Sequence, residues 1–231
     1  MEGENENDLR LSALCKSLGH LWAESDVVEV STEIPPTKMQ ECNLTLFGKL
    51  FSKPHVNFQA FTTVMKKAWK SESVVCLQKE LGLFSFVFQS EEEKERVKKT
   101  GPWSFGSNLL VLRQCDPEVP EQCYDYTRCA FWIQMGGIPP GWFREEVVAG
   151  LAERVGRVVE IKMGNSGSGP QKAGKVRVEI DLNSPLKSGA ILDIRKKKLW
   201  VEFKYERLPH YCYTCGRIRH YAIDCEEIPY E

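Results

Sequence analysis

The stretch SVVCLQKELGLFSFVFQS, residues 73–90, is the part of the chain that decides the fold most directly. Its two halves, 73–81 and 83–90, each predict a β-strand because they are rich in Val, Leu and Phe. Little more than Gly82 separates them, and a glycine between two strand-like runs predicts a tight turn. We therefore expect an antiparallel hairpin here.

The residues on either side of this hairpin complete a known order of elements. Before it, LTLFGKLF (44–51) is strand-like, and FQAFTTVMKKAWK (58–70) has apolar residues at a helical spacing. After it, Ser90 and three glutamates begin a helix that ends in lysines, and NLLVLRQ (108–114) predicts another strand. The resulting β-α-β-β-α-β order is the plan of ferredoxin-like and RRM domains. We predict an α+β fold built on a ferredoxin/RRM-like βαββαβ sandwich.

The rest of the chain divides around this sandwich. A smaller α/β extension is expected to follow. CAFWIQMGGIPP (129–140) predicts a strand and a turn, and REEVVAGLAERVGRVVEI (144–161) predicts a helix that runs toward a strand. Two further strands are predicted in GKVRVEIDL (174–182) and LWVEFKYERLP (199–209). The predicted parts are an acidic N-terminal helix and linker (1–40), the βαββαβ domain (41–117), the second α/β segment (118–208) and a C-terminal cysteine-rich segment (209–231).

Composition limits the class of protein. The chain has 231 residues and 42% hydrophobic content, which is enough for real cores. No run approaches the roughly 18 apolar residues that cross a bilayer. The acidic start MEGENENDLR lacks the apolar centre of a secretory signal. We expect an intracellular protein, nuclear or cytoplasmic, whose nine cysteines are reduced, so that paired cysteines bind metal.

The net charge of −1 hides an uneven distribution. Residues 1–43 hold three Lys/Arg against nine Asp/Glu, whereas residues 186–221 hold nine against three. A basic segment that leads into a cysteine cluster is typical of a polyanion partner, usually nucleic acid. The charge alone fits a solvated strand face equally well.

The segment CYTCGRIRHYAIDC carries a tetrad at Cys212-x2-Cys215-x4-His220-x4-Cys225. Zinc takes four N or S donors in a tetrahedron, and Cys-x2-Cys places two thiolates on one tight turn. Gly216 lets the backbone fold sharply after the second cysteine. Four protein ligands leave no open position, so we predict one structural Zn²⁺ ion. No Ser/His/Asp or Cys/His set stands out elsewhere, and we expect no enzymatic activity.

The RRM-like order raises the question of an RNA-binding sheet. Phe84, Phe86 and Phe88 alternate onto one face, which is either an RNA platform or the core. Leu46 sits where an RRM has a stacking aromatic, and Lys49 where the RRM pattern has Asn. We therefore favour the core for these phenylalanines.

The tetrad resembles the CCHC zinc knuckle, CX2CX4HX4C, of retroviral and retrotransposon gag proteins. Four stretches also resemble the gag-like family of plant LINE-type retrotransposons, in which an N-terminal domain of unknown function precedes such a knuckle. They are GPWSFGSNLLVL (101–112), IPPGWFREEVV (138–148), SPLKSGAILDI (184–194) and YERLPHYCYTCGRIRH (205–220). The resemblance covers residues 40–225.

This resemblance implies binding of single-stranded RNA or DNA, with bases on apolar residues and phosphates on basic ones. The implied contacts are Tyr213, Ile218 and Tyr221 as the apolar platform, and Arg217 and Arg219 as flanking cations. The lysine run Lys196, Lys197 and Lys198 is expected to meet phosphates as well. Arg219 departs from the family pattern, which has Gly before the histidine. The alternative is a protein-interaction or self-assembly module in which the knuckle is only structural.

Overall fold

The computed structural model describes residues 28, 30–164 and 174–218, and four positions beyond them: His220, Ile223, Cys225 and Glu226. The chain divides into two compact units, Met1–Pro35 and Pro36–Glu231, and every described helix and strand lies in the second. The helix expected within residues 1–40 lies outside the described residues. None of the helices in the described ranges has the length and apolar character needed to cross a membrane.

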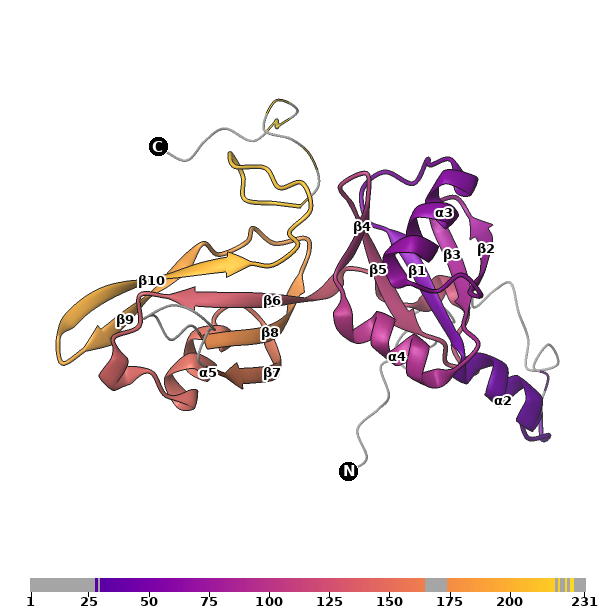
Figure 1. Cartoon of the computed structure of the whole chain (residues 1–231), viewed down its shortest axis with the longest axis horizontal. Coiled ribbons are helices and arrows are strands. Elements are labelled where there is room, and N and C mark those ends of the chain that lie inside the picture. The colour runs from indigo at the N-terminus through magenta and orange to yellow at the C-terminus, as the bar shows by residue number, and fades with distance from the viewer. Residues whose placement is uncertain are drawn as a thin grey trace, which may run out of the picture. The chain divides into compact units, whose positions relative to one another are not determined.

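The first sheet confirms the predicted α+β plan (Figure 1). Each strand is antiparallel to its neighbours. From one edge to the other the order is β2 (Val75–Glu80), β3 (Leu83–Val87), β1 (Thr45–Leu50), β5 (Asn108–Gln114) and β4 (Trp103–Phe105). Its helices are α3 (Phe58–Trp69) and α4 (Glu91–Thr100), and a short α2 (Pro36–Asn43) precedes β1. The central place of β1 between β3 and β5 is the ferredoxin-like arrangement. The three-residue strand β4 is an addition that the sequence did not predict.

Local sequence explains where these elements begin and end. The Asn57 side chain accepts a 3.0 Å hydrogen bond from the Ala60 amide and caps α3. Ser90 does the same for α4 by accepting from the Glu93 amide at 3.2 Å. Gly82 has φ +74°, the left-handed conformation that the turn between β2 and β3 requires. The predicted hairpin and helix start are therefore confirmed.

The helix-covered face of the first sheet is its core. Phe84, Phe86 and Phe88 are buried there with Phe61 and Trp69, and the Phe61 and Phe84 rings stack at 4.4 Å. The interpretation of these phenylalanines as core is confirmed. Leu46 belongs to the same cluster, so it does not occupy an outward stacking position.

The opposite face of the first sheet is covered by the segment that follows β5, residues 115–127. Phe47 on that face lies 5.4 Å from the Tyr124 ring, and Lys49 Nζ lies 5.6 Å from the Tyr126 ring. Lys79 pairs with Glu121 at 3.0 Å. Because this segment buries Phe47, the face that an RRM opens to RNA is largely closed here.

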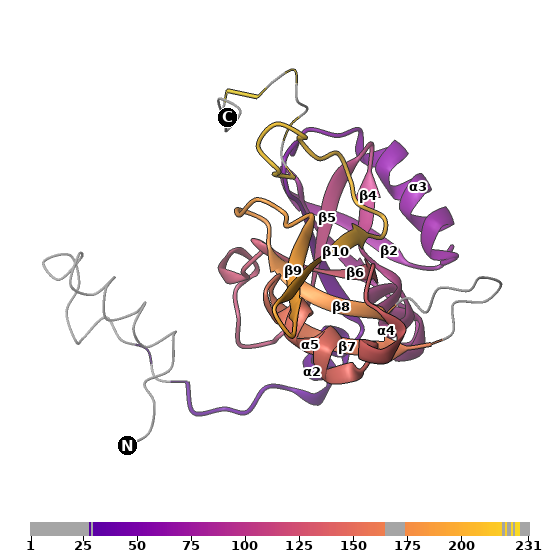
Figure 2. The same cartoon turned by 90° about the vertical axis from the view of Figure 1, so that its left-hand side faces the viewer.

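The second sheet repeats the strand order of the first (Figure 1, Figure 2). Its strands, again antiparallel, are β7 (Arg157–Met163), β8 (Gly174–Asp181), β6 (Arg128–Gly136), β10 (Lys197–Tyr205) and β9 (Gly189–Ile194). Helix α5 (Glu145–Glu153) packs Val148 and Leu151 into its core. The connection from β8 to β9, residues 182–188, contains no helix, whereas α4 joins the equivalent strands β3 and β4. The predicted strands near 157–163 and 174–182 are confirmed, and β9 is an addition.

Candidate metal centre

The cysteine-rich segment forms a tight turn after β10. The Cys212 amide donates to the Arg217 carbonyl at 2.9 Å, and the Gly216 amide donates to the Cys212 carbonyl at 2.8 Å. Gly216 has φ +74°, where a side chain would be strained. The glycine therefore allows the chain to reverse immediately after Cys215, as the sequence predicts.

This turn brings the four predicted ligands together. One donor atom each from Cys212, Cys215, His220 and Cys225 lies within 4.8 Å of the other three. The Cys215 Sγ and His220 Nε2 atoms are 3.4 Å apart. A tetrahedral zinc ion with Zn–S bonds of about 2.3 Å separates its sulfur ligands by about 3.8 Å. The donor types and their spacing fit one such ion. Cys212 and Cys215 are buried, as the ligands of closed structural sites are.

The electrostatic surroundings favour a thiolate at Cys212. Burial alone would raise its pKa, but the amides of Cys215 and Thr214 and the neighbouring thiols hold the pKa at about 6, below the usual value of a thiol. Cys129 shows the opposite behaviour because burial raises its pKa to about 12. Since zinc binds the deprotonated thiol, Cys212 is prepared as a ligand and Cys129 is an inert core residue.

The turn is fastened to the second sheet. The Leu186 amide donates a 2.7 Å hydrogen bond to the Gly216 carbonyl, and a Cβ atom on Gly216 would meet the Pro185 Cβ at 3.3 Å. Ile218 is 4% exposed and joins the same core cluster as Val148 and Leu151. The cysteine-rich segment thus packs on the helix-free connection 182–188.

The structure treats the predicted nucleic-acid contacts of the cysteine-rich segment differently from one residue to the next. Tyr213 is 87% exposed, and its ring meets Tyr211 edge-on at 4.9 Å, so a ring face remains accessible. The assignment of Ile218 to an exposed platform is wrong, because its side chain fills the core of the sheet. Arg217 is half-buried, and Arg219 and Tyr221 lie outside the described residues. Ile223 is 92% exposed, an apolar side chain next to the ligands that the sequence did not single out.

The lysine run lies apart from the metal ligands. Lys196 is in the turn between β9 and β10, and Lys197 and Lys198 begin β10, all three exposed. The cysteine-rich segment follows the other end of β10. Eight residue steps along the strand, from Lys197 to Tyr205, span about 26 Å. The lysines and the tetrad are therefore two separate places on the second sheet.

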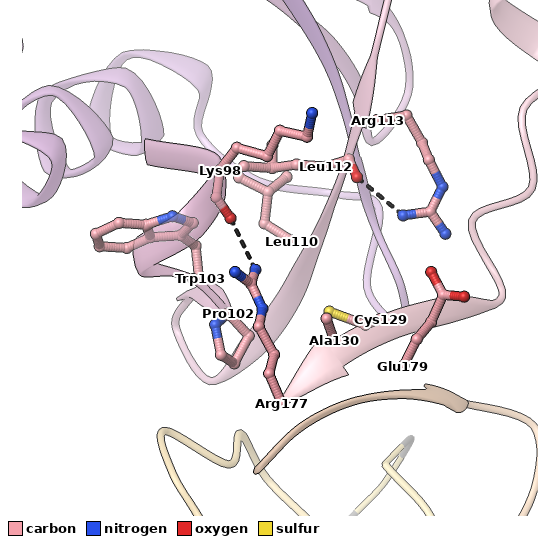
Figure 3. A pocket seen from close by; sticks show the side chains of 11 residues that line it. Lys98, Pro102, Trp103, Leu110, Leu112, Arg113, Cys129, Ala130, Arg177 and Glu179 are labelled. Carbon is pink, nitrogen blue, oxygen red and sulfur yellow. Dashed lines mark hydrogen bonds between the residues drawn. The ribbon is translucent and has the colours of Figure 1, made fainter. Parts of the chain in front are cut away.

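A small cavity elsewhere holds no catalytic set among the described residues (Figure 3). It has a volume of about 160 Å³, and its guanidinium groups are tied to carbonyl oxygens. Arg113 donates to Leu112 O at 2.9 Å, and Arg177 donates to Lys98 O at 3.0 Å. The Cys129 thiol, which also lines the cavity, has the raised pKa described above. These contacts are structural.

Comparisons with known proteins agree with two parts of this description. Residues 38–122 match the family model of DUF4283, a domain of unknown function, and residues 180–227 match that of a zinc knuckle. The chain also resembles the "Uncharacterized protein At4g02000" of Arabidopsis thaliana, with 25% identity over 131 residues. That match covers 56% of this chain and 41% of the relative, so the chain spans less than half the relative's length.

Several solved structures share low similarity with the chain. The RNA recognition domains 1 and 2 of Sex-lethal from Drosophila melanogaster align at 12% identity and a TM-score of 0.25, covering 58% of this chain and 85% of that one. The Sex-lethal protein/RNA complex aligns at 12% and 0.27, covering 70% and 98%. The three N-terminal RNA binding domains of yeast Prp24 align at 12% and 0.25, covering 69% and 65%. The fold assignment rests on the strand order of the two sheets, and the residues of the tetrad coincide with the zinc-knuckle match.

Proposed function

We propose that the chain binds single-stranded RNA or DNA without catalysis, through a knuckle held by one structural Zn²⁺ ion. The ligands are Cys212, Cys215, His220 and Cys225. The observation that carries the proposal is the position of an exposed aromatic ring, Tyr213, between the first two of these ligands. A rigid turn that presents an aromatic face to solvent is what unpaired bases stack on.

Two features of the surroundings support this function over catalysis and over nucleic-acid binding by the first sheet. Four protein donors fill the coordination of zinc, so no position is left for an activated water. The aromatic Phe47 on the outer face of the first sheet is covered by residues 115–127. The knuckle therefore offers an aromatic surface that the first sheet does not.

A titration of a fluorescent single-stranded oligonucleotide at several salt concentrations tests the proposal. Affinity should fall steeply with salt, because lysines and arginines displace counterions from phosphates. Tyr213→Ala should weaken binding by about 5- to 150-fold and leave the salt slope unchanged, since it removes stacking only. Tyr213→Phe keeps the ring and serves as the matched control. Equal affinities of the parent and Tyr213→Ala for the oligonucleotide would show that Tyr213 does not stack on its bases.

The ancestry of the chain is a separate proposal. The gag-like stretches in the sequence, together with the match of one chain to both DUF4283 and a zinc knuckle, support an origin in a plant LINE-type retrotransposon. Sequencing the genomic DNA downstream of the coding region tests this origin. A reverse-transcriptase reading frame or its remnant is expected there, and its absence from every copy of the locus would argue against it.

A self-association module is the second candidate. Strand β2 lies at the edge of the first sheet, and its Val75 and Leu77 side chains are exposed. Exposed apolar residues on a sheet edge favour pairing with another chain. Sedimentation of the parent and of Leu77→Lys tests this candidate: a dimer that the substitution dissociates supports it, and a parent that is monomeric at micromolar concentration excludes it.

A further inference from the structure

The second sheet carries an exposed tryptophan on the face away from α5. Trp200 in β10 is 55% exposed, whereas Trp132 on the neighbouring strand β6 is buried. Strand alternation puts Lys198, Trp200, Glu202 and Lys204 on the same face of β10. Opposite Trp200 on β9 is Ile191, which is also exposed. Two adjacent exposed apolar side chains on paired strands form a candidate contact surface.

The Trp200 indole lies against Gly189 of β9. A Cβ atom on Gly189 would come within 2.7 Å of Trp200 Cε2, closer than any real contact, so the ring occupies the space above the Gly189 backbone. The ring is therefore in contact with β9, while 55% of the residue remains exposed to solvent. A supported and exposed aromatic ring is a surface on which a base can stack.

A groove of about 390 Å³ runs beside the ring. The residues that line it are Gln134, Met135, Gly136, Gly137, Trp200, Glu202 and Lys204. A Cβ atom on Gly136 would meet nothing within 4 Å, so the groove is open beside this residue. The groove has the volume to take a nucleobase, and the exposed Lys204 ammonium, which pairs with Glu202 at 3.4 Å, is a polar group that can meet the edge of the base. The Gln134 amide donates a 2.8 Å hydrogen bond to Glu206.

The tip of the β9–β10 hairpin is strongly basic. Arg195 and Lys196 occupy the turn with φ +51° and +70°, and Lys197 and Lys198 follow. All four side chains are exposed. The hairpin, residues 189–205, holds five Lys/Arg against Asp193 and Glu202. An excess of cations beside an exposed aromatic ring matches a single-stranded polyanion whose bases stack.

We propose that the β9–β10 hairpin is a second contact surface for single-stranded nucleic acid, in which a base stacks on the exposed Trp200 ring and phosphates meet the basic tip. The proposal rests on the nucleic-acid binding proposed above, but it does not need the zinc ion. The competing occupant is a second copy of the chain, for which the charge excess at the tip would be unfavourable.

Binding of a fluorescent single-stranded RNA to the full chain tests this surface. Trp200→Ala should weaken binding by about 5- to 150-fold with an unchanged salt slope, both with zinc and with chelator present. Trp200→Phe should keep most of the affinity, whereas Trp200→Leu, which is apolar but not planar, should behave like alanine. Leu81→Ala removes a similarly exposed apolar side chain, 52% exposed, from the first sheet and should change nothing. Stacking should also quench tryptophan emission in the parent and not in Trp200→Phe.

Each other outcome contradicts the inference in its own way. If Trp200→Ala binds as tightly as the parent, both in the presence of zinc and in the presence of chelator, the hairpin is not a contact surface. The knuckle then remains the proposed binding site. If Trp200→Ala changes the sedimentation coefficient and not the affinity, the face joins two copies of the chain instead. If the parent fails to bind any single strand, both proposals fall together.

Discussion

The Leu186 amide and the Gly216 carbonyl, 2.7 Å apart, join the cysteine turn to the connection between β8 and β9. In the first sheet the corresponding connection contains helix α4, and in the second sheet it has only seven residues, 182–188. The knuckle contacts this shorter connection and adds Ile218 to the core. The C-terminal segment is thus an integral part of the second sheet's packing.

The first prediction concerns metal content. The full chain should carry one zinc ion, because four donor atoms gather at one place in the described part of the chain. Native mass spectrometry should show the mass of one ion, removed by chelator. Cys212→Ser should lose the ion, and Cys123→Ser, at an exposed cysteine outside the tetrad, should keep it. A chain that is metal-free as purified and does not take up added zinc would contradict the ligand set.

The second prediction tests the packing of the knuckle. Ile218→Ala should lower the free energy of unfolding by about 2–5 kcal/mol, because it leaves a cavity in the hydrophobic core. Ile223→Ala is the matched control, and its exposed side chain should contribute less than about 0.5 kcal/mol. Urea denaturation followed by circular dichroism measures both. Similar midpoints for the two variants would show that Ile218 is not in the core.

The third prediction concerns Gly216. Gly216→Ala should cost about 1–2 kcal/mol, because alanine is strained at a positive φ and its Cβ would press on Pro185. The loss should appear as weaker zinc affinity in a competition with a chromogenic chelator. Gly141→Ala, where a Cβ meets nothing within 4 Å, is the control and should bind zinc like the parent. Unchanged zinc affinity in Gly216→Ala would mean that the turn does not need this conformation.

The fourth prediction separates charge from stacking. Replacing Lys196, Lys197 and Lys198 by glutamine should flatten the dependence of log affinity on log salt by about 2 units, since each phosphate contact to a single strand contributes about 0.7. The same replacement at Lys66, Lys67 and Lys70, at the end of α3 on the first sheet, should leave the slope unchanged. Equal slopes for both triple variants would show that the hairpin tip does not meet phosphates.

Sequence predicted the elements whose signals are local. The Ser90 cap and the Gly82 turn depend on neighbouring residues, and both are confirmed. The burial of Ile218 depends on contact with a segment some thirty positions earlier, which no local pattern reveals. In sequence, Leu46 lines up with the outward stacking position of an RRM, but its side chain lies in the core. Residues 115–127 also bury the other face of β1, so both faces of this strand are apolar and the sequence shows no alternation.

The candidate site shows the same division. The spacing of the tetrad predicted which donor atoms come together. All four ligands lie within residues 212–225, so the chain between them is too short to separate them widely. The exposed Trp200 could have been found, because it alternates with Lys198 and Glu202 in a strand of period two. Its exposed neighbour Ile191 lies across the hairpin on β9, and strand β9 was not predicted from the sequence.

Zinc-dependent binding is decided by the affinity of the full chain for a fluorescent single-stranded RNA, measured by anisotropy with zinc and with chelator. Chelation should weaken binding by about 5- to 150-fold, because the Tyr213 surface loses its support, while the basic hairpin retains weaker, salt-sensitive binding. Circular dichroism should show that the two sheets persist. An affinity that chelation leaves unchanged, with zinc shown to be removed, would contradict a zinc-dependent reader.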